Sequence, residues 1–197
     1  MGEKSVNKKK FILEKATEIF SKKGYLNTTM KDVVDACEIS RGGVYLYFED
    51  IKDLFEAVME YAYEDIQAVD KKELEKLSDD ATYADVLALF IKERKKSILS
   101  KKSNLTVAIY EYYFENKVAA KNNNLKKEFD MSLYFLEQLI QDGIDAGEFY
   151  DIDAHRAASN LMFVLEGLRV AAKARGISEN AVDEEIMYVM QGIIAED

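Results

Sequence analysis

The segment SRGGVYLYF, residues 40–48, combines residue types that suit binding to a polyanion. Two adjacent glycines stand beside an arginine and two tyrosines, although each glycine inside a helix costs about 1 kcal/mol relative to alanine. Something is therefore expected to come close to this backbone. The major groove of B-DNA admits one helix, while hydroxyls, amides and cations hold the phosphates along its rim. The chemistry that these residues indicate is noncovalent recognition of duplex DNA.

A helical wheel divides this segment into two faces. Val44 and Phe48 form an apolar inner edge that would pack on the preceding helices. On the outer side, the glycines would bring the backbone to the base edges, the arginine would pair with guanine, and the leucine would meet a thymine methyl. The tyrosines would bond phosphates or bases. The predicted outer face consists of Gly42, Gly43, Leu46 and Tyr47, flanked by Arg41 and Tyr45.

Helices predicted from apolar spacing and capping residues position this segment. A first helix ends at Gly24, and Thr29 with Asp32 predicts the capped start of a second helix. Ser40 caps the third helix about three residues after the second ends, which is typical of a helix-turn-helix. Because N-H groups at the start of a helix attract phosphate, Thr28 and Thr29 are also predicted DNA contacts.

The rest of the chain is also predicted to be helical. Asp50 and Asp53 cap a fourth helix, and the charged stretch 70–81 resembles a linker. The absence of proline, and only nine glycines, favour an all-α fold without a sheet. The later helices are predicted at residues 82–100, 104–119, 123–146, 153–175 and 179–195.

The stretch from Phe11 to Leu54 resembles the DNA-binding domain of the tetracycline-repressor-like (TetR/AcrR) transcriptional regulators. The matching pattern is I-L-x-x-A-x-x-I-F-x-x-x-G-Y-x-x-T-T-M-x-D-V, followed by I-S-R-G-G-V-Y-L-Y-F. The resemblance implies that residues 1–50 form a helix-turn-helix DNA-binding domain and residues 51–197 a helical ligand-binding and dimerisation domain. It further implies a repressor that binds a palindromic operator as a dimer and is released by a small ligand.

Two positions depart from the family's pattern. Members commonly have a lysine three residues after the phenylalanine of the Y-x-Y-F element, where it contacts a phosphate, and here that position is Ile51. Lys31 or Lys52 is therefore predicted to supply a phosphate contact. Glu38 stands in the turn where glycine is frequent, which implies backbone strain if the residue needs a positive φ.

The charge distribution agrees with a DNA-binding end. The chain carries a net charge of −10, yet residues 1–48 hold nine basic and six acidic residues, which leaves 18 basic and 31 acidic residues for the remainder. A mildly basic head on an acidic body is expected.

The helical body is predicted to bind a ligand and to dimerise. Aromatic residues with a few carboxylates could enclose a flat or cationic apolar ligand. Helices 153–175 and 179–195 carry apolar stripes, and Ala157, Ala158, Gly167, Ala171 and Ala172 permit close approach to a second subunit. The predicted ligand-binding residues are Phe90, Tyr110, Glu111, Tyr113, Phe114, Tyr134, Phe163 and Glu166.

Several function classes are disfavoured. A single cysteine, Cys37, and a single histidine allow neither an internal disulfide nor a zinc site, and Cys37 is expected to be buried. With no phosphate-binding glycine loop either, no enzyme activity, cofactor or metal is expected. No apolar run is long enough to cross a bilayer, so a cytoplasmic protein without a membrane partner is predicted. The alternative is a helical protein-interaction adaptor that does not bind DNA.

Overall fold

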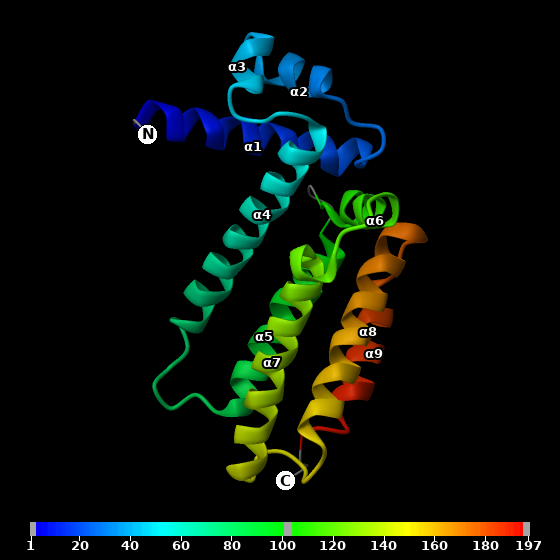
Figure 1. The fold of residues 1–197 in the computed structure, drawn as a ribbon. Coiled ribbons are helices and arrows are strands. Elements are labelled where there is room, and N and C mark those ends of the chain that lie inside the picture. The colour runs from blue at the N-terminus through cyan, green and yellow to red at the C-terminus, as the bar shows by residue number, and fades with distance from the viewer. Residues whose placement is uncertain (1–2, 101–103, 195–197) are drawn as a thin grey trace. The chain divides into compact units, whose positions relative to one another are not determined.

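The computed structural model describes residues 3–100 and 104–194, which fold into α-helices joined by short loops (Figure 1). Within these residues there are nine α-helices, one 3-10 helix and no strand beyond an isolated bridge between Phe149 and Ile194. The predicted all-α fold is confirmed. The chain forms two compact units, here called the first unit (residues 3–68 and 104–118) and the second unit (residues 69–100 and 119–194).

The first unit contains α1 (Glu3–Lys23), α2 (Met30–Cys37), α3 (Arg41–Tyr45), α6 (Thr106–Glu115) and α4 (Ile51–Leu74) up to residue 68. Its core joins all five helices. The buried residues include Ile12, Ala16 and Phe20 of α1, Val33 and Cys37 of α2, Val44 of α3, Leu54, Phe55 and Val58 of α4, and Ala108 and Tyr112 of α6. The predicted burial of Cys37 is confirmed.

An aromatic cluster connects α6 to the other helices of the first unit. The ring of Phe55 lies 4.6 Å from Phe20 and 5.4 Å from Tyr112 between centroids, and Tyr25 contacts both Phe55 and Tyr112. The Tyr112 hydroxyl also donates to the carboxylate of Glu56 on α4. Burial and this acidic neighbour raise the pKa of Tyr112, so its hydroxyl stays a donor. α6 is therefore fixed within the first unit.

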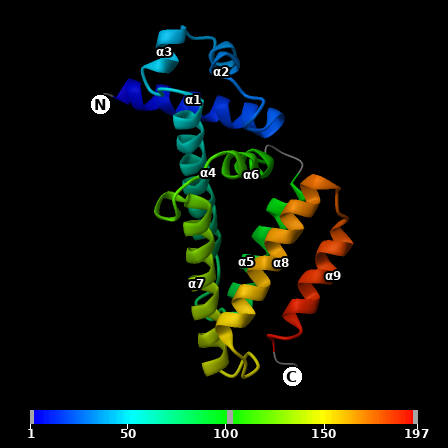
Figure 2. The same cartoon turned by 45° about the vertical axis from the view of Figure 1, so that its right-hand side comes forward.

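The second unit consists of α5 (Tyr83–Leu99), the 3-10 helix η1 (Ala120–Asn122), α7 (Asn124–Asp145), α8 (Ala154–Ala174), α9 (Glu179–Met190) and the end of α4. α7 packs along α8, and α5 and α9 flank them (Figure 2). At the α7–α8 turn, a Cβ at Gly143 would lie 2.3 Å from the Phe149 ring, so glycine allows this aromatic to close the core.

The structure differs from the predicted elements in several places, among them the helix predicted over 179–195, since α9 ends at Met190. α4 continues to Leu74, so the first part of the predicted linker 70–81 is helical. α3 has only five residues and ends at Tyr45. Ala158, a predicted close-approach residue, is fully buried in the second unit's own core and cannot meet a second subunit. The predicted division after residue 50 was based on function and stays a prediction.

Candidate nucleic-acid interface

Capping residues fix the path of the chain through α2 and α3. Thr29 and Asp32 form a reciprocal capping box at the start of α2, as predicted. Glu38 ends α2 in the left-handed region, with φ of 53°, and its N-H donates to the carbonyl of Asp35. Ser40 then caps α3 by accepting the N-H of Gly43 at 3.2 Å. The three residues between the helices thus form the tight turn of a helix-turn-helix.

The outer face of α3 presents the residue types that read a major groove. Leu46 directly follows the helix and is 77% exposed, and a Cβ at Gly42 would meet no atom within 4 Å. The guanidinium of Arg41 lies 5.1 Å from the centroid of the Tyr45 ring and donates to the Tyr45 hydroxyl at 3.4 Å. Backbone, aliphatic and cationic groups are therefore available together on one face.

The expectation that Gly43 and Tyr47 share this outer face is wrong. Gly43 is half-buried and faces α1, where an added Cβ would lie 3.4 Å from the Nζ of Lys8. Tyr47 is half-buried as well, and its hydroxyl lies 3.2 Å from the Oγ of Ser5. Gly43 lies within α3, on the side that faces α1. For Tyr47 the reason is that α3 ends at Tyr45. The N-H of Tyr47 bonds to the carbonyl of Val44 at 2.9 Å, so the chain turns more tightly than an α-helix.

The two threonines before α2 serve the fold. Thr28 is buried, and its hydroxyl donates to the carbonyl of Gly24 at 2.6 Å. The hydroxyl of Thr29 donates to Asp32 at 2.7 Å. The ammonium of Lys23, 2.6 Å from the Asp32 carboxylate, and the Thr29 bonds lower the pKa of Asp32 to about 2. An ionised carboxylate thus already occupies this helix end, and phosphate binding by Thr28 or Thr29 stays a prediction.

The two lysines proposed to replace the family's phosphate anchor differ in their surroundings. Lys31 is paired with Asp35 one helical turn later. Lys52, at the start of α4, is exposed and forms no ion pair with any residue in the described part of the chain. A lysine that is already paired gains less from a phosphate, because it must first give up its partner. This geometry favours Lys52 over Lys31.

The predicted ligand-binding residues are divided between the two units. Tyr110, Glu111, Tyr113 and Phe114 belong to α6 in the first unit, and Phe90, Tyr134, Phe163 and Glu166 to the second. Glu111 holds the turn after α1: its carboxylate accepts the N-H of Leu26 at 3.2 Å and fills the space beside Gly24, whose φ is +77°. Tyr113 packs edge-on against the buried Tyr112.

In the second unit, the predicted aromatic residues form separate ring pairs. The ring centroids of Phe90 and Phe135 lie 6.0 Å apart. The guanidinium of Arg94 lies 4.8 Å from the centroid of the Phe90 ring. Phe163 contacts Phe129 at 5.2 Å, yet it remains 65% exposed. The side chain of Tyr134 is exposed as well. The ligand-binding role of these residues stays a prediction.

Glu128 on α7 is a polar residue that the sequence analysis missed. Burial raises its pKa to about 7, against an opposing effect from Arg169 on α8. The signal was present in the sequence: the buried Leu136 and Ile140 follow Glu128 by eight and twelve residues, on the same helical stripe. A carboxylate on that stripe points to a polar group inside the second unit.

A groove of about 260 Å³ lies between α1 and α4 in the first unit. None of the predicted ligand-binding residues lines it, whereas Tyr47 does. Across residues 3–100 and 104–194, no cluster of three or more His, Cys, Asp or Glu side chains is arranged to hold a metal. No described helix has both the length and the apolar character needed to cross a bilayer.

Two family profiles match the chain. The family described as "Bacterial regulatory proteins, tetR family" matches residues 12–58, and "Tetracyclin repressor-like, C-terminal domain" matches residues 86–183. The chain is 30% identical over 142 residues to the uncharacterised HTH-type transcriptional regulator YfiR of Bacillus subtilis (strain 168), covering 72% of this chain and 67% of that protein.

Solved structures share the fold at low sequence identity. A transcriptional regulator from Saccharomonospora viridis in complex with choline superposes with a TM-score of 0.83 at 18% identity, covering 95% of this chain and 98% of that one. The SmeT–triclosan complex gives a TM-score of 0.71 at 18% identity, covering 96% and 93%. The outer face of α3, the two matching profiles and the relative all agree: this chain is a non-enzymatic, DNA-binding transcriptional regulator that belongs to the TetR family.

Proposed function

We propose that this chain is a cytoplasmic, ligand-responsive repressor that binds a palindromic DNA operator as a homodimer. The observation that carries the proposal is the outer face of α3, where Arg41 is stacked on Tyr45 beside the open backbone of Gly42. Arg41 would read a guanine, Leu46 would contact a thymine methyl, and Tyr45 would bond a phosphate. Lys52 would add a backbone contact at the start of α4.

The second unit is the proposed site for a small apolar or cationic effector. Its ring pairs offer aromatic faces, and Glu128 offers an acidic group next to Phe129 in sequence. Aromatic faces with one acid suit a flat or cationic ligand. Two regulators of the same fold have been solved with choline and with triclosan, which supports a small-molecule effector of this size class.

Dimerisation is proposed to use α8 and α9. The exposed positions Phe163, Gly167 and Val170 follow one another along α8 at helical spacing, and a Cβ at Gly167 would meet nothing within 4 Å. On α9, Met187 and Tyr188 are exposed large apolar residues. A smooth apolar stripe of this kind allows the helices of two subunits to pack closely.

α6 is the proposed link between effector and DNA. It belongs to the DNA-binding first unit, and the chain leaves the second unit shortly before it and returns to the second unit shortly after it. Glu111 and Tyr112 tie α6 to the α1–α2 turn and to α4. An effector that moves α6 would therefore move the recognition helix, and effector and operator would weaken each other's binding reciprocally.

The test is selection of bound sequences from a random duplex library over a series of salt concentrations. Recovery of a palindrome bound by a dimer supports the proposal, with affinity falling steeply as salt rises because phosphate contacts dominate. The adaptor alternative instead expects no salt-dependent DNA affinity. Within the selected site, Arg41→Ala should relax the preference at one base pair at a cost of about 1–3 kcal/mol, whereas Tyr45→Ala should weaken all sequences similarly.

A further inference from the structure

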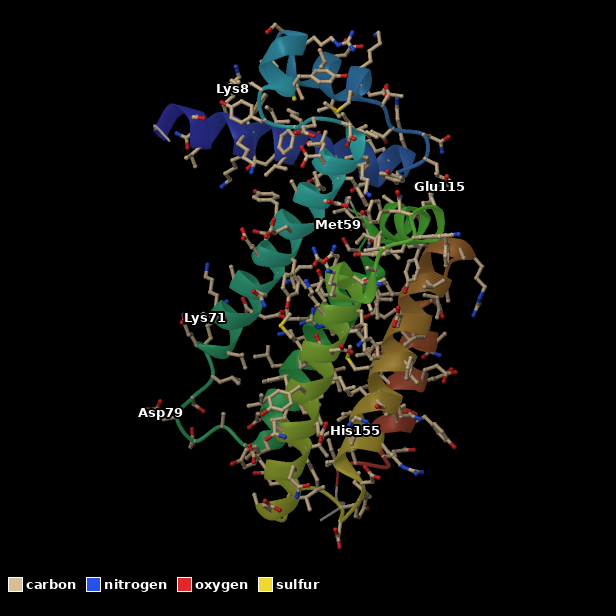
Figure 3. All side chains as sticks on the ribbon, viewed as in Figure 1. Lys8, Met59, Lys71, Asp79, Glu115 and His155 are labelled. Carbon is tan, nitrogen blue, oxygen red and sulfur yellow. The ribbon has the colours of Figure 1, made fainter. Side chains whose placement is uncertain are left out.

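The ammonium of Lys8 lies against the recognition helix, although the two are 35 residues apart in the sequence. A Cβ built on Gly43 would lie 3.4 Å from the Nζ of Lys8 and 3.3 Å from the Oγ of Ser40. Figure 3 shows Lys8 on the side of α1 that faces α3. Gly43 therefore leaves room for a lysine from another helix at the first turn of α3, which gives this glycine a role different from that of the open Gly42.

The ammonium of Lys8 is not engaged in an ion pair with any described residue. In the described part of the chain no carboxylate pairs with it, whereas three other lysines of α1 lie within 4 Å of an acid: Lys10 at 3.9 Å, Lys15 at 3.9 Å and Lys23 at 2.6 Å. An unpaired surface cation next to a DNA-reading helix loses no protein partner when a phosphate arrives. Lys9, whose Nζ lies 5.7 Å from the centroid of the Phe48 ring, and Lys22 also form no ion pair with the described residues, so it is the position against α3 that distinguishes Lys8.

The position of Lys8 suits a phosphate better than a base. Lys8 lies beside α3 on the side that faces α1. Gly42 and Leu46 lie on the outer side of α3, which would enter the major groove. When a helix lies in the major groove, its flanks face the sugar-phosphate rims. A lysine is a compact point charge on a flexible stem, which matches a phosphate oxygen without requiring one base.

We propose that Lys8 is a DNA-backbone contact, holding one phosphate at the rim of the groove that α3 enters. The proposal rests on the proposed DNA-binding function and adds to it a sequence-independent contact supplied by α1. Nothing in the sequence spacing singles Lys8 out, since it begins a run of three lysines that differ only in what they meet in the folded chain.

The test compares Lys8→Gln with Lys10→Gln in the full-length protein. Glutamine keeps most of the stem and removes the charge. Lys10 lies on the same helix but is paired with Glu14, which makes it a matched control. Affinity is measured on the selected operator and on a random duplex between about 50 and 200 mM salt. Lys8→Gln is expected to weaken both about 3- to 10-fold and to reduce the log–log salt slope by about 0.9. Lys8→Arg is expected to restore the slope.

The possible results distinguish the Lys8 phosphate contact from DNA binding in general. If wild type lacks salt-dependent DNA binding, the proposed function fails, and the Lys8 contact fails with it. If wild type binds but Lys8→Gln keeps the wild-type slope, or if Lys10→Gln lowers the slope equally, the phosphate contact is refuted while DNA binding stands. A loss confined to the operator, with an unchanged slope, would refute it in favour of base reading. A fall in melting temperature alone would not change the slope, so a purely structural role is also detected.

Discussion

Arg41 is held in place on α3 before any DNA arrives. Its guanidinium stacks on the ring of Tyr45 one turn later and donates to the hydroxyl of the same residue. Holding a long side chain in advance lowers the entropy lost on binding. The stacking also keeps the two residues together, with Arg41 proposed to read a base and Tyr45 proposed to contact the DNA backbone. Their opposite expected effects on specificity and affinity follow from this arrangement.

Glu128 should make the free energy of unfolding depend on pH. Burial raises its pKa to about 7, so folding favours its protonated form. Below the unfolded pKa of about 4.3 the carboxyl is neutral in both states and costs the fold nothing; as pH rises from there through 7, the folded state loses stability because the half-buried group must ionise. Glu128→Gln should therefore stabilise the protein at pH 8 by roughly 1–3 kcal/mol and make no difference near pH 4. Urea unfolding at the two pH values tests this, with the exposed Glu184→Gln as control. An equal gain at both pH values would contradict the burial argument.

The turn between α2 and α3 holds Glu38 in a strained backbone conformation. Glu38 is the only residue other than glycine with a positive φ in the described ranges, 3–100 and 104–194. Residues other than glycine rarely adopt a positive φ, because their Cβ crowds the backbone in that region. The capping bonds before and after the turn hold it in place: Glu38 N-H to Asp35 and Gly43 N-H to Ser40.

Glu38→Gly should consequently stabilise the protein. Glycine adopts a positive φ without strain, and the relief of about 1 kcal/mol exceeds the entropy cost of the more flexible unfolded chain, for an expected gain of about 0.5 kcal/mol. The matched control is Ala36→Gly in the regular part of α2, which should destabilise by about 1 kcal/mol. Thermal or urea unfolding measures both. A destabilised Glu38→Gly variant would show that the turn needs the glutamate side chain.

For the whole molecule, the two compact units have different proposed roles. The first unit contains the helix-turn-helix and α6, and the second unit contains the half-buried Glu128 and the exposed apolar stripe of α8. Each unit has its own core. A regulator built this way can join two copies through one unit while the other remains free to bind DNA.

Val170→Glu should dissociate the proposed dimer. Val170 is 40% exposed on the α8 stripe, and a carboxylate buried there against a second copy would lack a partner. We expect the dimer dissociation constant to rise at least about tenfold, which corresponds to about 1.4 kcal/mol. Light scattering over a concentration series measures it. Ile66→Glu, at an exposed apolar position on α4, is the control and should leave the mass unchanged. A dimer that survives Val170→Glu would place the interface elsewhere.

The sequence by itself determined the helices and their caps, because periodicity and capping act over a few neighbouring residues. Thr29 with Asp32, and Ser40 before α3, predicted the helix-turn-helix, and the structure contains both caps. It also predicted part of the reading face, since Arg41, Gly42, Tyr45 and Leu46 are exposed. It missed that Gly43 faces Lys8 of α1, and that Tyr47 lies beyond the end of α3, where the helical wheel no longer applies.

Only the tertiary structure decided which residues from distant segments meet. It brought Lys8 to Gly43, Glu111 to the turn at Leu26, and Glu128 close enough to Arg169 for the two charges to interact. None of these pairs lies within one helical turn in the sequence, so no local pattern could identify them. Their physical cause is the packing of whole apolar faces, which fixes where each polar side chain ends up once the cores have formed.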